Sequence, residues 1–139
     1  MIPTSPKRGR KKKMSESRLK NEVAEKMRTD FEVFNEVSGF VNYRKEFWNF
    51  FGIDRARVRA DFLLSPKSYL IQAGFPAGLV AVEVKYFQRA GLIRQYCQAL
   101  KQAADYAVSS FELCGSRNNM PLLALLASNM QEIEEGLPK

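Results

Sequence analysis

Hydrophobic and polar residues recur along this 139-residue chain with two different periods, and the period predicts the elements. Near the start, Leu19, Val23 and Met27 are four residues apart and form one apolar stripe. This spacing predicts a helix that Ser15 or Ser17 caps and that ends near residue 28. A second and clearer helix is expected over 92–108. Its predicted apolar stripe consists of Ile93, Cys97, Leu100, Ala104 and Ala107.

Four segments have the composition or alternation of β-strands. Segment 31–41 is rich in Phe and Val and contains Gly39, which fits a strand with a bend. Segments 58–64 and 79–87 alternate with period two. Segment 120–128 is a near-continuous apolar run, as expected of a buried strand. The alternation in the second segment predicts that one face of the strand carries Val58, Ala60, Phe62 and Leu64.

The connection between the second and third strands indicates how they pair. It contains Gly74, Pro76 and Gly78, so we expect the two strands to be antiparallel neighbours. The order helix, strands, helix, strand predicts an α/β or α+β fold in a single domain. Segment 43–52 is crowded with aromatic residues and fits a short helix as well as an irregular packed segment.

The composition excludes several kinds of chemistry. The chain contains no histidine, which excludes Ser-His-Asp hydrolysis, Cys-His proteases and His-ligated zinc catalysis. Cys97 and Cys114 form no CxxC pair, and two thiols are too few for a disulfide scaffold. No apolar run approaches the roughly 18 to 20 residues that cross a bilayer, and no apolar segment follows the basic start as in a secretory signal. We therefore expect a soluble, cytoplasmic protein.

The net charge of +7 lies in the first 20 residues, which hold eight basic residues against Glu16 alone. Because residues 1–14 contain Pro3, Pro6, Gly9 and little that is apolar, we expect a disordered basic arm before a domain at 15–139. Such a run can bind nucleic acid in a salt-sensitive way, and it is as typical of a solubilising or targeting tail. The candidate DNA-contacting residues of the arm are Lys7, Arg8, Arg10, Lys11, Lys12 and Lys13.

The candidate chemistry lies on the second and third strands. Glu83 and Lys85 are two apart, so both side chains leave the same strand face about 6.5 to 7 Å apart. Asp61 projects from the neighbouring strand, so two carboxylates and an ammonium meet if the strands pair. Two hard oxygen donors suit Mg²⁺, which polarises a phosphodiester, and Lys85 then positions the attacking water or stabilises developing negative charge.

These residues resemble a known family. Asp61, followed by Glu83-Val84-Lys85 in an apolar strand, is similar to the D…(D/E)-x-K motif of the PD-(D/E)XK nuclease superfamily, which includes restriction endonucleases, Holliday-junction resolvases and VRR-NUC-type nucleases. The resemblance covers about residues 15–128 and departs from the motif at Ala60, where the family has proline. It implies a restriction-endonuclease-like fold with a central mixed β-sheet flanked by helices.

The resemblance also implies roles for individual residues. In that superfamily the two acids of the motif bind a divalent metal and the lysine assists hydrolysis, which implies Asp61 and Glu83 as metal ligands and Lys85 as the catalytic lysine. The backbone carbonyl of Val84 would be a further metal ligand. Gln102 resembles a glutamine that contacts the lysine or the substrate in some branches, and a solvent-facing helix position is the alternative.

A glutamate of the first helix often completes such a site. This implies Glu22 as a third metal ligand, with Glu25 and plain surface charge as alternatives. Outside the motif, Arg55, Arg57 and Arg59 are candidates for phosphate contacts, and ordinary surface charge explains them equally well.

We therefore expect a Mg²⁺-dependent DNA endonuclease that acts on branched, flapped or junction DNA, as in DNA repair and recombination, with Mn²⁺ able to substitute. One alternative is a non-catalytic nucleic-acid-binding protein with a nuclease-like fold, and another is a restriction or repair exonuclease. A homodimer is one option, because the aromatic residues at 47–51 could supply an interface, although core packing is the favoured role for that segment.

Overall fold

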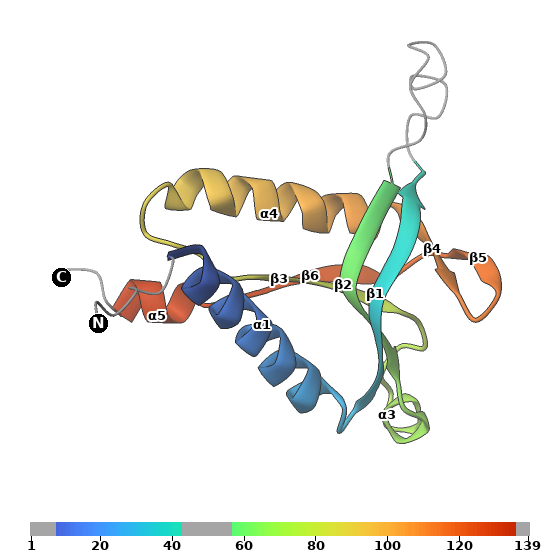
Figure 1. The fold of residues 1–139 in the computed structure, drawn as a ribbon. Coiled ribbons are helices and arrows are strands. Elements are labelled where there is room, and N and C mark those ends of the chain that lie inside the picture. Colours follow the sequence, from blue (N-terminus) through green and yellow to red (C-terminus); the bar gives the residue numbers. More distant parts are fainter. Residues whose placement is uncertain (1–7, 43–56, 136–139) are drawn as a thin grey trace, which may run out of the picture.

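A six-stranded mixed sheet forms the centre of the molecule, with the strand order β5-β4-β1-β2-β3-β6 (Figure 1). The computed structural model describes residues 8–42 and 57–135, and of residues 8–15, 117 and 118 it describes the backbone alone. Neighbouring strands are antiparallel except β3 and β6, which are parallel. The strands are β1 (Phe31–Val41), β2 (Arg57–Pro66), β3 (Val80–Lys85), β4 (Ser109–Leu113), β5 (Ser116–Asn119) and β6 (Leu123–Ser128).

The two long helices lie on opposite faces of this sheet (Figure 1). The expected fold, a mixed sheet flanked by helices in one domain, is confirmed. No helix in the described part of the chain is long and apolar enough to span a membrane. The helices are α1 (Arg8–Met27), α3 (Ser68–Gln72), α4 (Leu92–Ala107) and α5 (Met130–Glu135).

Helix α1 packs on the sheet through the apolar stripe that the sequence predicts. Leu19, Val23 and Met27 pack, together with buried Ala24, against the cluster formed by β2 and β3. The helix begins at Arg8, seven residues before Ser15. Residues 8–14, which the sequence assigns to a disordered arm, therefore continue α1 in this structure, whereas residues 1–7 lie outside the described residues.

Strands β1 and β2 change faces half-way along their length. In β2, Phe62 and Leu64 pack on the α1 side, whereas Val58 and Ala60 belong to the cluster that contains Tyr106 of α4. The expectation that these four β2 residues share one face is therefore wrong. The change occurs at Asp61.

The backbone of β1 explains this change of face. Glu36 has a φ of 49°, in the left-handed region that non-glycine residues rarely adopt. The ladder between β1 and β2 runs in one register on both sides of this residue but omits the pair Glu36–Asp61. Asp61 thus lies where β2 passes from the α1 layer to the α4 layer.

Strand β3 follows the sequence-based expectation closely. It pairs with β2 in antiparallel register, from Phe62 opposite Val82 to Leu64 opposite Val80. Its even residues pack against α1, and Ala81 packs on the α4 side, so simple alternation holds here. Gly39 of β1 has a different role from the predicted bend. A Cβ there would collide with the carbonyl of Ser110 and lie 2.8 Å from the Phe111 ring, so the glycine permits the close approach of β4.

Helix α4 lies where the sequence predicts it, but a different side of it faces the sheet. Its buried residues are Ala99, Ala103 and Tyr106. Ile93 is 81% exposed and Leu100 is 45% exposed, so the predicted apolar stripe faces largely outward. The apolar residues of α4 thus span a wide arc of the helix, and the sheet covers only the part that contains Ala99, Ala103 and Tyr106.

The end of the chain contains more strands than expected. Residues 115–119, whose polar composition is typical of a loop, include β5, which pairs with β4. Strand β6 is an edge strand rather than a buried one, with Leu123 and Leu125 almost half exposed. The aromatic segment 47–51 lies outside the described residues.

Candidate functional site

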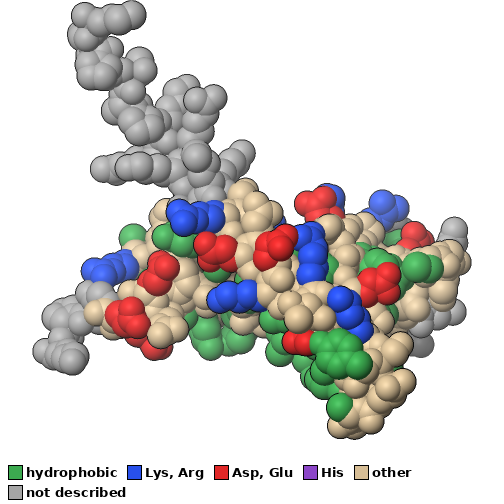
Figure 2. Space-filling model, turned by 90° about the horizontal axis from the view of Figure 1, so that it is seen from below, with side chains coloured by type: hydrophobic (Ala, Val, Ile, Leu, Met, Phe, Trp, Pro, Cys, Tyr) green, Lys and Arg blue, Asp and Glu red, His purple; other side chains and the backbone are tan. Residues whose placement is uncertain are grey.

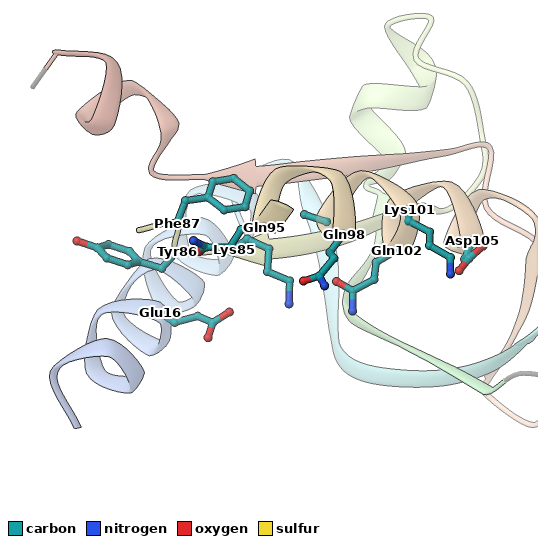
Figure 3. Close-up of a pocket in the computed structure, with 10 residues that line it drawn as sticks. Glu16, Lys85, Tyr86, Phe87, Gln95, Gln98, Lys101, Gln102 and Asp105 are labelled. Atoms are coloured by element: carbon teal, nitrogen blue, oxygen red, sulfur yellow. The ribbon is translucent and has the colours of Figure 1, made fainter. Parts of the chain in front are cut away.

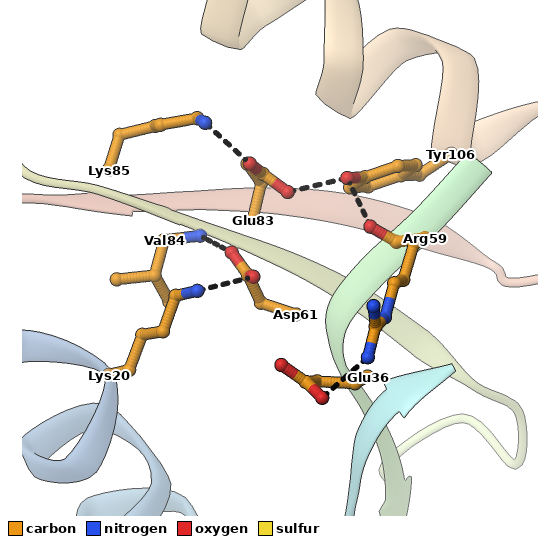
Figure 4. Close-up of polar contacts among 8 residues, drawn as sticks. All are labelled: Lys20, Glu36, Arg59, Asp61, Glu83, Val84, Lys85 and Tyr106. Atoms are coloured by element: carbon orange, nitrogen blue, oxygen red, sulfur yellow. Dashed lines mark hydrogen bonds and ion pairs between the residues drawn. The ribbon is translucent and has the colours of Figure 1, made fainter. Parts of the chain in front are cut away.

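The side chain of Asp61 lies in the gap where β2 and β3 separate (Figure 4). The backbone ladder ends at the pair Phe62–Val82. Two residues further along β3, the N–H of Val84 donates instead to Oδ2 of Asp61, over 2.7 Å. Because the N–H and C=O of a strand residue point to the same side, the carbonyl of Val84 also faces the side on which Asp61 lies.

Glu83 is the buried acid of the site, with 4% of its surface exposed. Its Oε1 is 3.1 Å from the ammonium of Lys85, and its Oε2 is 2.6 Å from the hydroxyl of Tyr106. The expected meeting of two carboxylates and an ammonium therefore occurs, with Asp61 and Glu83 on adjacent strands (Figure 4).

The surroundings of Glu83 shift its pKa upward. Burial raises the pKa of Glu83, as does the negative charge of Asp61, and the hydrogen bonds and charge from Tyr106 and Lys85 only partly oppose this. The Tyr106 hydroxyl lies 2.6 Å from Glu83 and 2.7 Å from the carbonyl oxygen of Arg59, but it has one proton. The hydroxyl therefore shares that proton between Oε2 of Glu83 and the carbonyl oxygen of Arg59, both of which accept from it.

Helix α1 contributes a lysine that the sequence analysis did not single out. The ammonium of Lys20 is 3.0 Å from Oδ1 of Asp61, and the two side chains are 35% and 15% exposed. Burial alone would lower the pKa of Lys20, but the hydrogen bond and charge of Asp61, with the charges of Glu16 and Glu83, raise it above its ordinary value. The site thus holds two acids and two ammonium groups.

A cleft of about 430 Å³ opens beside Lys85, between Glu16 in the middle of α1 and the polar side of α4 (Figure 3). Gln102, an exposed residue of α4, lines this cleft together with Gln98, Lys101 and Lys85. On the α1 side the lining acid is Glu16, one helical turn before Lys20. The cleft therefore adjoins the site through Lys85 and runs along a row of polar α4 side chains, and neither Asp61 nor Glu83 is among its lining residues.

The structure does not bring Glu22 to this site. Glu22 pairs with Arg18 at 3.4 Å and lines a different cleft, which contains neither Asp61 nor Glu83. Glu25 lines a cleft of about 320 Å³ on the other side of Asp61, but it pairs with Arg28. Of the acids of α1, Glu16 is the one that shares a cleft with Lys85, because it lies on the helix side that carries Lys20.

The candidate DNA-contacting arginines that the structure describes contact different groups. Arg59 pairs with Glu36 at 2.6 Å, and the guanidinium of Arg57 stacks 5.7 Å from the centre of the Phe40 ring. Arg55 and Lys7 lie outside the described residues. Figure 2 shows basic and acidic side chains interspersed over the face that carries α1, rather than separated into two patches. The backbone positions of five arm residues lie in the first turns of α1, namely Arg8, Arg10, Lys11, Lys12 and Lys13.

The donor set fits a divalent cation that prefers oxygen. Asp61 and Glu83 supply carboxylates, and the Val84 carbonyl faces the same gap. Mg²⁺ is commonly held by one or two carboxylates, with water and phosphate oxygens completing its shell. Among the residues that the structure describes, no group of three or more His, Cys, Asp or Glu gathers as a complete cage. The arrangement thus offers part of a coordination shell and leaves the rest for water or a phosphate.

Sequence reasoning assigned no role to two residues that contact the acids, Lys20 and Tyr106, although Tyr106 belongs to the helix whose glutamine and tyrosine carry part of the resemblance. The signal for Tyr106 is its position four residues after Gln102, which places both on neighbouring turns of one helix. The signal for Lys20 is weaker, because it adjoins Leu19 of the inward stripe and so lies at the edge of the buried face.

Comparisons with protein-family models, with curated proteins and with solved structures found no match to this chain.

Proposed function

We propose that the protein is a Mg²⁺-dependent DNA endonuclease that hydrolyses phosphodiester bonds in branched, flapped or junction DNA. One observation supports this proposal above the others. Two carboxylates from adjacent strands lie at the point where those strands separate, one of them is buried, and a lysine on the same strand pairs with it. This arrangement also supports the resemblance to the PD-(D/E)XK nucleases.

The residues would share the work as follows. Asp61, Glu83 and the carbonyl of Val84 would hold Mg²⁺, which when bound polarises the scissile phosphate and makes bound water more acidic. Lys85 is 33% exposed at the mouth of the cleft, where its ammonium can orient the attacking water and stabilise negative charge on phosphorus. Tyr106 fixes the orientation of Glu83 from behind.

The polar lining of the cleft beside Lys85 suits the sugar-phosphate backbone of a nucleic-acid strand. Gln98, Lys101 and Gln102 offer amide and ammonium donors to phosphate and sugar oxygens. Such contacts place the backbone of a nucleic acid without reading its sequence, which agrees with an enzyme that recognises the shape of DNA.

The test is a cleavage panel with linear, nicked, flapped and four-way DNA in the presence of Mg²⁺ or Mn²⁺. We expect Asp61→Asn and Lys85→Met to lower cleavage at least about a hundredfold while DNA affinity is retained. Glu32→Gln is the matched control, because Glu32 is an exposed acid on β1 opposite Ser65, far along the ladder from Asp61. Wild-type protein that binds these substrates but cuts none of them would contradict the proposal.

One observation favours the alternative of a non-catalytic nucleic-acid-binding protein. Each carboxylate of the site already has an ammonium partner, Lys20 for Asp61 and Lys85 for Glu83. A network of this kind can hold a fold together without chemistry. If this alternative is correct, the cleavage panel is negative and DNA binding is indifferent to Mg²⁺.

A further inference from the structure

The four charged groups of the site balance one another. Lys20 and Lys85 carry two positive charges, and Asp61 and Glu83 can carry two negative charges. A divalent cation entering this cluster adds two positive charges beside two ammonium groups. The cation therefore binds more weakly if both ammonium groups stay in place, because each repels it, and more tightly if one ammonium moves away.

Lys20 is the group that competes directly for Asp61. Oδ2 of Asp61 accepts from the Val84 N–H, which is fixed in the sheet, and Oδ1 pairs with Lys20. Because the sheet already uses Oδ2, Oδ1 is the oxygen that Asp61 offers more readily to a cation, and Lys20 pairs with that oxygen. Lys85, in contrast, pairs with the other carboxylate from the same strand.

The ammonium group of Lys20 can also move to other positions near acidic residues. Its side chain is 35% exposed at the end of a flexible four-carbon stem. The cleft of about 320 Å³ that it lines contains Glu25 and Glu36 as further acids. Glu16, one turn earlier on α1, already acts on it electrostatically. Separating the Lys20 ammonium from Asp61 therefore costs less free energy than it would for a fully buried ammonium with no other acid nearby.

We propose that Lys20 is a built-in counter-ion that occupies Asp61 in the metal-free protein and is displaced when a divalent cation binds. The inference depends on the proposed function, since it assigns to Lys20 the control of cation affinity at that same site. It predicts that the wild-type chain binds a divalent cation more weakly than its acid pair alone would allow.

The experiment is calorimetric titration of the full chain with MnCl₂ in the absence of DNA. We expect Lys20→Met to bind Mn²⁺ roughly tenfold more tightly, which is the effect of removing one unit charge about 6 Å from a divalent ion in water-like surroundings. Lys20→Arg retains the charge and should bind Mn²⁺ as the wild type does. Lys26→Met is the control, because Lys26 is an exposed lysine of α1. It lines the cleft that contains Glu22, which neither Asp61 nor Glu83 lines.

A second measurement protects the result against misfolding. Without metal, Lys20→Met should melt at a lower temperature than the wild type because Asp61 loses its partner. Adding Mn²⁺ should remove this difference in melting temperature. Equal or weaker Mn²⁺ binding by a folded Lys20→Met protein would overturn the counter-ion role alone. If neither protein binds Mn²⁺, the proposed function fails as well. Adding Asp61→Asn to Lys20→Met should abolish the gain, and a gain that survives this change would also overturn the proposal.

Discussion

At the scale of single residues, the pair Glu83 and Tyr106 decides the electrostatics of the site. A carboxylate with 4% of its surface exposed loses most of its hydration, and one tyrosine and one lysine replace only part of it. The pKa of Glu83 is therefore raised, so folding favours its protonated form. The buried carboxyl group of Glu83 is therefore less favourable at neutral pH than a neutral group of the same shape would be.

Glu83→Gln should therefore raise stability at pH 7. A raised folded-state pKa means that the native protein holds a proton that the unfolded chain releases, so the contribution of Glu83 is lost as the pH rises from about 4.5, its ordinary value, through the folded pKa. Thermal melting of both proteins from pH 4 to pH 8 measures this. The two curves should coincide near pH 4 and separate above it, with the variant more stable. A variant that is less stable at pH 7 would contradict the burial argument.

Tyr106→Phe should weaken both the fold and the site. The change removes hydrogen bonds to Glu83 and to the Arg59 carbonyl, and we expect a loss of about 1 to 2 kcal/mol in the free energy of unfolding, measured with urea. If cleavage is present, kcat should fall while KM stays the same, because Tyr106 contacts the acid and not the substrate. Tyr96→Phe is the control, since Tyr96 is 39% exposed, and a loss of stability as large in the control would remove the special role of Tyr106.

At the scale of elements, helix α4 shows which information a periodic pattern contains. The pattern places the bounds of the helix within a residue, since the expected range 92–108 compares with Leu92–Ala107. It does not show which half of a wide apolar arc faces the sheet, because Ala99 and Ala103 are small and contribute little to a hydrophobic stripe. The large residues Ile93 and Leu100 dominate that stripe, yet they lie outward.

Two matched substitutions on α4 test this orientation. Ala99 has no exposed surface, so Ala99→Leu should overpack the contact with Phe87 and Ile133 and cost about 1 to 3 kcal/mol. Ala104 is exposed, so Ala104→Leu should change stability by less than about 0.5 kcal/mol. Urea denaturation of both variants measures the difference. The sequence pattern alone predicts the opposite order, and that order would show that α4 is turned the other way.

The same limits apply to the strands. The sequence predicts β1, β2 and β3, their approximate bounds and the pairing of β2 with β3, because alternation and turn chemistry are local signals. It does not predict the change of face at Asp61, because that depends on the left-handed backbone of Glu36, a residue with no turn signature. It also misses the β4–β5 hairpin, because the polar segment 115–119 has the composition of a loop.

At the scale of the whole molecule, the candidate site combines residues from three separate parts of the chain. The motif on β2 and β3 supplies the part that the sequence predicts, Asp61, Glu83 and Lys85. The parts that it could not predict, Lys20 and Glu16 of α1 and Tyr106 of α4, depend on how the two helices dock on opposite faces. Docking angles follow from tertiary packing, which has no local signal in the chain.

The distribution of charge gives the last expectation. The whole net charge of +7 belongs to residues 1–20, so DNA affinity should depend strongly on salt through this segment. Replacing Lys11, Lys12 and Lys13 together with glutamine should lower the slope of log affinity against log salt concentration by about 3 at most. Lys26→Gln is the single-charge control. Glutamine is about as good a helix former as lysine, so the melting temperature should stay the same. An unchanged slope would show that this run does not contact phosphate.

The separation of the site residues along the chain indicates the order in which their contacts form during folding. Asp61 and the Val84 N–H are 23 positions apart and lie on one hairpin, whereas β3 pairs with β6 only across 43 positions, from Val80 to Leu123. Closing a shorter loop costs less entropy, and local contacts form sooner. We therefore expect the β2–β3 hairpin to bring the two acids together before β6 joins the sheet. An early folding state would then expose the acid pair before α4 and Tyr106 enclose it.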